Sequence, residues 1–578
     1  MKHTRTLIAA TLALTLASCG QQPTAPVAAL PTPGADSQAE VIPGAYLVGF
    51  KQDALSAQNL TEQAAVQAQA ITAAGGVMTS QWAEISAAAV KLDASALAKL
   101  QGNPMVEYVE PDLVRHALGF KSGVTDAAAS RPALSSQGLS AQALYTASGE
   151  TTWGDNALRV PALQTANYKG AGVAVCIGDT GIDGNHPEFQ RRIKAFKNFT
   201  GELNRDNPYQ LNDVSHHGTH VAGTVFAQYG AGTGASGLQS GMDANGVGGV
   251  ATEANLYIAR VLGDTGSGSS SGIINGVNWC AAQLKSQGGT EAKVVISLSL
   301  GGGRASKTEQ RAYTSVWQKG AMTIAATGND GAAVSYPAAY TEVVGIGAVD
   351  SNLAKADFSN FGTQVDLVGP GVDVISSVPL GQGTRALASG GGVNFSDVQA
   401  ADLTGKGTVN GTIVAGGGTN NEFCGVGARN SALSGNIALI SRGTCSFEEK
   451  VANAVGSGAT AVMIYNNAAG SLGMSLTNQY NVPVVGLLQA DGQALLGKLP
   501  TTGSVTVGAA DYESYNGTSM ATPHVSAAAA VVWAAKPTLT NTQLLNLLTN
   551  TAKDLGTAGK DNNFGYGLVD PYKAITGL

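Results

Sequence analysis

Residues 173–183 read VAVCIGDTGID, an apolar run that ends on a carboxylate and a glycine turn. Further short apolar runs, separated by helical stretches, follow at residues 256–261, 294–298, 323–326 and 343–348. Strands that alternate with helices predict a parallel sheet covered on both faces. Asp179 would then lie at the carboxyl end of a central strand, where open α/β sheets hold their sites. Taken alone, it is equally well explained as a helix cap or turn residue.

Two other segments carry candidate chemistry. Residues 216–224 read HHGTHVAGT, in which His217 and His220 form either a metal-binding pair or a packed pair. The glutamate of a zincin helix is missing, which argues against a metal. Residues 516–525 read NGTSMATPHV, and Ser519 follows a glycine turn into an alanine-rich helical stretch. Its hydroxyl would lie near the positive end of the helix dipole, although a plain N-cap serine is the alternative.

The three segments occur in the order Asp, His, Ser, which is the order in subtilisin. From about residue 153 to 569, apart from an insertion, the chain resembles the subtilisin-like serine proteases (subtilases, peptidase S8). The resemblance implies that Ser519 is the nucleophile, His217 the general base and Asp179 the residue that orients the imidazole. It also implies that Asn329, in the segment AATGND, and the backbone N–H of Ser519 stabilise the oxyanion.

The resemblance extends to substrate and ion contacts. Two flexible segments resemble the walls of the substrate groove, and they comprise Gly266, Ser267 and Gly268 on one side and Ser299, Leu300 and Gly301 on the other. No cofactor is expected for catalysis. Residues 243–250, DANGVGGV, resemble a stabilising ion loop with few carboxylates, so a structural calcium ion is left open and the metal ligands are unknown.

The first residues predict export. Lys2 and Arg5 precede an apolar run at residues 7–16 that is too short to span a bilayer, so residues 1–19 are predicted to be a signal peptide. The small residues before Cys19 also resemble a lipobox, which would make Cys19 a lipidated N-terminus; an ordinary signal peptide is the alternative. We therefore expect a secreted or cell-envelope protein whose contact with membrane is limited to this anchor.

The remaining chain divides by composition and pattern. Residues 20–41 are predicted to be a flexible tether, and residues 42–116 an α+β ferredoxin-like unit that resembles an inhibitor I9-type propeptide. Residues 117–150 are rich in Ser, Ala and Gly and predict a linker with the processing site. The α/β catalytic unit, expected to have the three-layer subtilisin-like fold with a central parallel sheet, would cover residues 151–380 and 510–578. A β-rich insert at residues 381–509 resembles a protease-associated (PA) domain.

Cysteine content and charge narrow the partners. Cys424 and Cys445 are candidates for a local disulfide in the insert, whereas Cys176 and Cys280 are left open as a pair or as buried thiols. The net charge of −7 offers no basic footprint, so no nucleic-acid partner is expected.

The predicted function is a serine endopeptidase that acts through an acyl-enzyme and is made as a self-processing zymogen. Its partners would be protein or peptide substrates and its own propeptide as inhibitor. One alternative is a catalytically inactive subtilase-like protein that binds partners through the PA insert. An α/β-hydrolase esterase would need its histidine last, which this order contradicts. The insert lacks histidine, and its return point close to Ser519 suggests that it overhangs the groove and gates or docks large substrates.

Overall fold

The computed structural model describes residues 40–52, 59–121, 144–232, 242, 245–395, 397–468 and 472–578. The predicted signal peptide with Cys19, nearly all of the tether and most of the linker lie outside these residues. Among the residues described, no helix has the length and apolar character needed to cross a membrane.

The N-terminal unit is an antiparallel sheet with two helices, as the alternation of elements predicts. Its elements are β1 (Val41–Phe50), α1 (Leu60–Ala74), β2 (Val77–Trp82), β3 (Ala87–Lys91), α2 (Ala94–Gln101) and β4 (Val106–Ala117), with strand order β4-β1-β3-β2. Asn59 and Glu62 form a capping box at the start of α1, and the Asp93 side chain caps α2. Buried residues such as Ile71 and Leu100 hold the helices on the sheet. This unit has the predicted ferredoxin-like form.

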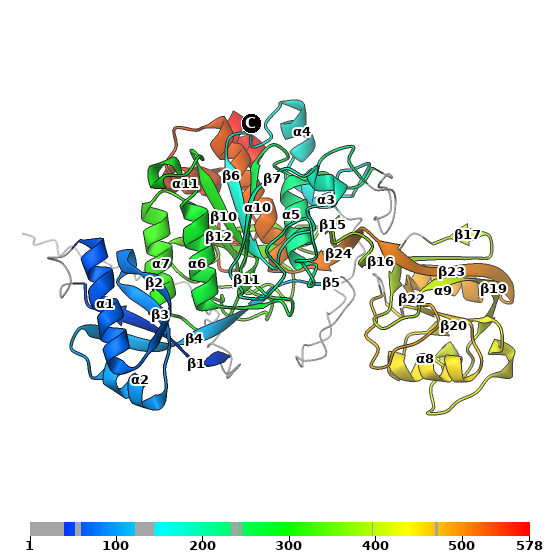
Figure 1. Cartoon of the computed structure of the whole chain (residues 1–578). Coiled ribbons are helices and arrows are strands. Elements are labelled where there is room, and N and C mark those ends of the chain that lie inside the picture. The colour runs from blue at the N-terminus through cyan, green and yellow to red at the C-terminus, as the bar shows by residue number, and fades with distance from the viewer. Residues whose placement is uncertain are drawn as a thin grey trace, which may run out of the picture.

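The catalytic unit contains the predicted parallel sheet, in the order β14-β13-β12-β10-β6-β8-β7. The strands are β6 (Ala174–Asp179), β7 (Ile193–Asn198), β8 (Asn255–Arg260), β10 (Val294–Leu298), β12 (Met322–Ala326), β13 (Val343–Val349) and β14 (Leu367–Pro370). Helices cover both faces, with α6 (Ser270–Ala281) and α7 (Lys307–Gln318) on one side and α5 (His217–Phe226) and α10 (Thr518–Ala535) on the other (Figure 1). The inner strands are buried almost along their whole length because both faces are covered, whereas the edge strand β7 is partly exposed.

The insert is a separate β-rich unit with its own core. Its first and last long strands, β16 (Gly383–Gly390) and β23 (Thr501–Ala510), pair antiparallel from Gly383 opposite Ala510, so the insert leaves and returns at one place. The other strands are β17 (Val393–Asn394), β18 (Val398–Ala400), β19 (Gly407–Ala415), β20 (Ile437–Ser441), β21 (Ala461–Tyr465) and β22 (Val484–Leu487), with helices α8 (Phe447–Gly456) and α9 (Gln489–Leu496). Figure 1 shows the insert beside the catalytic unit, at the side opposite the N-terminal unit.

One stretch of chain links the N-terminal and catalytic units. Strand β4 continues into the catalytic unit between two short strands, β9 (Ser267–Ser269) and β11 (Leu300–Gly301), and is antiparallel to both. Beyond it, β5 (Phe120–Lys121) pairs with β24 (Tyr512–Asn516), which also pairs with β15 (Val374–Ser377). The boundary predicted at residue 117 stays a prediction, and the described residues 117–121 run along the catalytic unit in extended form.

The four cysteines of the described residues form two disulfides. Cys424 and Cys445 are bonded within the insert. Cys176 of β6 is bonded to Cys280 of α6, which resolves the alternatives that the sequence left open. The second bond ties a central strand to a covering helix in the buried core.

Candidate active site

Three segments distant in sequence meet at the carboxyl edge of the parallel sheet. Asp179 is the last residue of β6, His217 the first of α5, and Ser519 the second of α10. The Asp179 Oδ1 atom lies 2.7 Å from His217 Nδ1 and accepts a further hydrogen bond of 2.7 Å from the Thr180 N–H. The carboxylate is fully buried, so these two bonds fix its orientation.

The electrostatics of His217 favour its protonated form. Burial alone would lower the pKa of this imidazole, but the charge and hydrogen bond of Asp179, with a contribution from Asp213, outweigh burial and raise it. Among the described residues, His217 Nε2 has no hydrogen-bond partner. The Ser519 hydroxyl donates instead to the Ser299 carbonyl at 2.9 Å.

Asn329 lies on the loop after β12 and points its amide at the chain's own backbone. The Asn329 Oδ1 atom accepts hydrogen bonds of 2.9 Å from both the N–H and the hydroxyl of Thr518. This fixes the side-chain amide so that Nδ2 donates to the carbonyl oxygen of Leu118. The Ser519 N–H points at the same oxygen from 3.4 Å. Two donors therefore converge on one carbonyl, beside the hydroxyl of Ser519.

The residues predicted to line the groove flank the segment that carries this carbonyl. His116 pairs with Ser267 and Arg115 with Gly268, and the Ala117 N–H donates to the Gly266 carbonyl at 2.9 Å. On the other wall, Ala117 pairs with Leu300 and His116 with Gly301. The Leu118 N–H donates to the Ser299 carbonyl at 3.2 Å. All six predicted residues thus contact residues 115–118 through the backbone, as an extended peptide would be held.

Two glycines permit this close approach. Gly517 has φ of 150°, a conformation that favours glycine, and a Cβ there would overlap the Leu118 carbonyl oxygen. A Cβ on Gly119 would lie 2.7 Å from His217 Nε2. The bond between Leu118 and Gly119 therefore lies directly between the imidazole and the nucleophile helix.

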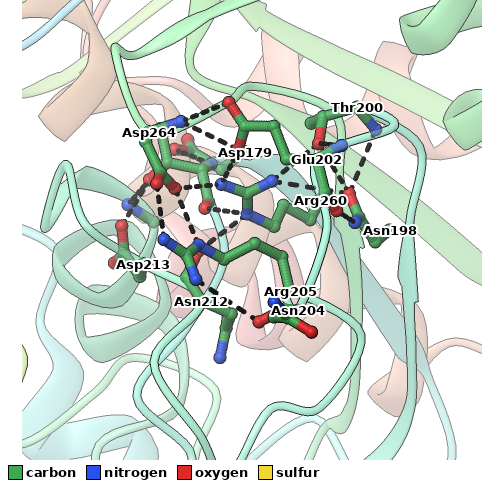
Figure 2. A network of polar contacts seen from close by, with 12 residues as sticks. Asp179, Asn198, Thr200, Glu202, Asn204, Arg205, Asn212, Asp213, Arg260 and Asp264 are labelled. Carbon is green, nitrogen blue, oxygen red and sulfur yellow. Dashed lines mark hydrogen bonds and ion pairs between the residues drawn. The ribbon is translucent and has the colours of Figure 1, made fainter.

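A buried polar network supports the turn that follows Asp179 (Figure 2). The Arg260 side chain is fully buried, and its Nε–H donates to the carbonyls of Thr180 at 3.0 Å and Asn212 at 2.7 Å. Its Nη2 atom donates to the carboxylates of Glu202 and Asp264, each at 2.6 Å. The Asp213 carboxylate, also labelled in the figure, accepts from the Thr180 hydroxyl at 2.7 Å. The network fixes the backbone on which the catalytic candidate Asp179 sits.

The second histidine of the motif is a packed residue. His220 Nε2 lies 3.0 Å from the Val374 carbonyl and 3.1 Å from that of Glu513, and the ring stacks on Tyr515 at 4.3 Å. Burial lowers the pKa of His220 to about 3, so the ring is neutral. Among the residues described, no group of three His, Cys, Asp or Glu side chains is placed to hold a metal ion.

The described part of the predicted ion loop offers few oxygen ligands for a calcium ion. Glu188 faces this loop, and its carboxylate accepts hydrogen bonds from the N–H groups of Val247 and Gln228 and from the Tyr512 hydroxyl. Calcium needs six to eight oxygen ligands, whereas these groups present hydrogen-bond donors. The described residues therefore do not fit a calcium ion in this arrangement.

Sequence reasoning missed a charged pair at the same groove. Arg115 of β4 and Glu309 of α7 form a buried ion pair with an N–O distance of 2.6 Å. The one available signal for a buried partner was an arginine that directly follows the apolar residues Leu113 and Val114. Nothing in the sequence connects that position with Glu309, which lies 194 residues away.

Comparisons with known proteins agree with this architecture. Residues 170–390 and 487–567 match the model of the subtilase family, residues 409–495 match the PA domain, and residues 29–112 match the fervidolysin N-terminal prodomain. Subtilisin NAT from Bacillus subtilis subsp. natto and subtilisin E from Bacillus subtilis strain 168 are each 33% identical over 341 residues, which are 58% of this chain and 74% of each relative.

Two solved structures share the fold. The psychrophilic subtilisin-like protease Apa1 from the Antarctic psychrotroph Pseudoalteromonas sp. AS-11 is 30% identical, with a TM-score of 0.53 over 74% of this chain and 97% of that one. Fervidolysin from Fervidobacterium pennivorans is 20% identical, with a TM-score of 0.55 over 94% of this chain and 62% of that one, and at this identity it supports the fold alone. The chain, with its prodomain and PA insert, belongs to the subtilase family and is a serine endopeptidase.

Proposed function

We propose that Asp179, His217 and Ser519 form the catalytic triad, and that the chain is a precursor that cuts its own Leu118–Gly119 bond. The observation that carries the proposal is the position of the Leu118 carbonyl. Its oxygen accepts from Asn329 Nδ2 and from the Ser519 N–H, while the peptide on either side is held as a strand. Oxyanion donors aimed at one carbonyl mark it as the reacting group.

The reaction follows from this geometry. The Ser519 hydroxyl turns from the Ser299 carbonyl toward His217 Nε2, gives up its proton there and attacks the Leu118 carbonyl carbon. Asp179 keeps the Nδ1–H of the imidazole oriented, while Asn329 and the Ser519 N–H stabilise the oxyanion. The C–N bond then breaks, and the proton on His217 passes to the Gly119 nitrogen. Water hydrolyses the acyl-enzyme and releases the carboxylate of Leu118. Protein substrates would take the place of residues 114–121 in later turnovers.

A serine substitution tests the assignment. The purified Ser519→Ala precursor should remain intact, whereas the wild-type chain should yield a fragment whose N-terminal residue is Gly119, identified by N-terminal sequencing and intact mass. Ser526→Ala is a matched control, because Ser526 is also buried on α10 but bonds to Ser297 inside the core. A mature band from Ser519→Ala, made without other proteases, would show that another nucleophile acts. No finding favours the catalytically inactive alternative.

The prodomain would remain an inhibitor after the cut, because β4 keeps its pairing with both walls of the groove.

We also propose export and lipidation at Cys19, supported by the charged and apolar run that precedes it. Metabolic labelling with a radioactive fatty acid, lost in Cys19→Ser, tests the anchor.

No cofactor takes part in the reaction. The described residues do not fit the structural calcium ion that the sequence left open, so added calcium should leave the thermal unfolding midpoint of the Ser519→Ala protein unchanged, and a raised midpoint would contradict this.

A further inference from the structure

The buried ion pair stands at a defined distance from the bond proposed to be cut. Arg115 is the third residue before Leu118, and its backbone pairs with Gly268 on one wall of the groove. The side chain is directed into the catalytic unit and is 2% exposed. An extended substrate held by the same walls would direct the side chain at this position into the same pocket, because strand pairing fixes the register.

The pocket contains a carboxylate arranged for a guanidinium group. Arg115 Nε donates to Glu309 Oε1 at 3.0 Å and Nη2 to Glu309 Oε2 at 2.6 Å, which is a bidentate contact. The Nη2 atom also donates to the carbonyl of Arg304 at 2.7 Å. Burial alone would lower the pKa of Arg115, but the charge and hydrogen bonds of Glu309 outweigh it and raise the pKa, so the guanidinium stays protonated.

The catalytic unit holds this carboxylate in place by itself. The Ser270 hydroxyl donates to Glu309 Oε1 at 2.5 Å and the Tyr340 hydroxyl to Oε2 at 2.9 Å. A Cβ on Gly302 would lie 2.8 Å from Arg115 Nη1, so the lack of a side chain there makes room for the guanidinium. Only Arg115 comes from the prodomain. When the prodomain leaves, a preformed pocket with a buried carboxylate remains without its cation.

A simpler interpretation is that the pair only fastens the prodomain to the enzyme. The strand register indicates that the pocket also receives a substrate side chain, because it opens on the same walls, β9 and β11, that hold the backbone next to the reacting carbonyl. A buried carboxylate without a cation is costly, so side chains that supply one are favoured over apolar side chains of similar length. Lysine would satisfy the charge but not the bidentate geometry or the Arg304 carbonyl.

We propose that Glu309 makes this pocket a guanidinium-binding subsite, so that the enzyme prefers protein substrates with an arginine three residues before the residue whose carbonyl is attacked. This inference rests on the proposed function. The inference specifies which substrates bind best in the groove that residues 114–118 occupy in the precursor.

Quenched-fluorescent peptides spanning residues 113–121, LVRHALGFK, test the preference on the mature enzyme. The parent peptide is compared with the same peptide carrying Arg115→Lys or Arg115→Met. Removing one partner of a buried charge pair costs enough to expect kcat/KM to fall by at least about 30-fold from arginine to methionine. The lysine peptide should fall between them.

Enzyme variants then assign the preference to one residue. In Glu309→Gln the ratio of kcat/KM for the arginine and methionine peptides should fall close to 1, through loss on the arginine peptide. Turnover of the methionine peptide reports whether Glu309→Gln is folded. The peptide series on the wild-type enzyme tests the preference even if this variant does not fold. Glu291→Gln is a matched control, since Glu291 is a buried carboxylate bound by Tyr257 and Asn255 near the amino end of the sheet, and it should keep the wild-type ratio.

The outcomes separate the two proposals. Equal cleavage of the arginine and methionine peptides by the wild-type enzyme would overturn the subsite and leave the proposed function standing. An unchanged ratio in active Glu309→Gln would also overturn it. If the wild-type enzyme cuts none of the peptides, the proposed function itself fails, and the preference fails with it.

Discussion

Replacing Asn329 with alanine is the sharpest test of how the groove stabilises the oxyanion of the tetrahedral intermediate. The structure gives the Leu118 carbonyl two donors, and they are unequal: Asn329 Nδ2 is close, whereas the Ser519 N–H lies 3.4 Å away. Loss of one oxyanion donor costs acyl-transfer enzymes, subtilisin among them, about 100-fold to 1000-fold in turnover. Because the weaker donor is the one left, Asn329→Ala should lie near the upper end, at about 4 kcal/mol of lost transition-state stabilisation.

The assay follows self-cleavage of the purified full chain by intact mass, together with kcat and KM for a peptide substrate. The loss should appear in kcat, with KM nearly unchanged, since the donor acts on the transition state. Asn541→Ala is a matched control, because Asn541 is a buried asparagine whose amide donates to the carbonyls of Trp317 and Ala321, away from the groove. Equal losses in the two variants, or no loss in Asn329→Ala, would refute the oxyanion role.

Other expectations follow from burial and charge. Arg260→Met should lower the free energy of unfolding by about 3 kcal/mol, because it leaves the buried carbonyls of Thr180 and Asn212 without their donor and the partly exposed carboxylates of Glu202 and Asp264 without their cation; urea titration measures this, and a loss within error would contradict the role of the network. Burial raises the pKa of Asp155 to about 7, above its ordinary 3.8, so stability should fall as the pH rises through that window. The fall in stability with pH should be shallower in Asp155→Asn than in its parent, both proteins carrying Ser519→Ala. Part of the fall should persist, because burial also raises the pKa of Glu188 to about 7, and an unchanged fall would exclude Asp155. Processing of the precursor should accelerate with pH through a midpoint above 6.5, because His217 accepts a proton only when neutral and its pKa is raised; a midpoint below 6.5 would contradict this. Replacing residues 381–509 with a short Gly/Ser loop should preserve cleavage of small peptides while changing the rate on large proteins, and a folded variant without peptide activity would make the insert part of the active site.

Much of the fold was predictable because local patterns determine it. The apolar run at 173–178 could only be a buried strand once it was seen among four similar runs, and Asp179 at its end marked the edge where the site lies. The start of α10 was predictable in the same way, since Gly517 and the alanine-rich stretch after Ser519 signal a turn into a buried helix. In each case the signal lies within about ten residues.

The parts that sequence could not supply depend on pairing between distant segments. Residues 117–121, ALGFK, directly precede a stretch with the small and polar composition of a linker, yet they form strand pairs because Leu300 and Tyr515 lie at strand edges that accept them. The Cys176–Cys280 bond required the distance between β6 and α6, which no spacing rule provides. That the insert overhangs the groove stays a prediction, and Figure 1 shows the insert beside the catalytic unit, beyond β24.

The shortness of β9 and β11 has a consequence for the enzyme once its prodomain has gone. Departure of β4 uncovers two facing strand edges with unpaired backbone groups, which in many proteins would invite self-association. These edges are only three and two residues long, and they face one another across a slot one strand wide. A neighbouring sheet cannot enter such a slot, whereas a single unfolded segment can. The width of the slot would therefore admit only those substrate segments that are locally unfolded. This selection acts before any side chain is recognised.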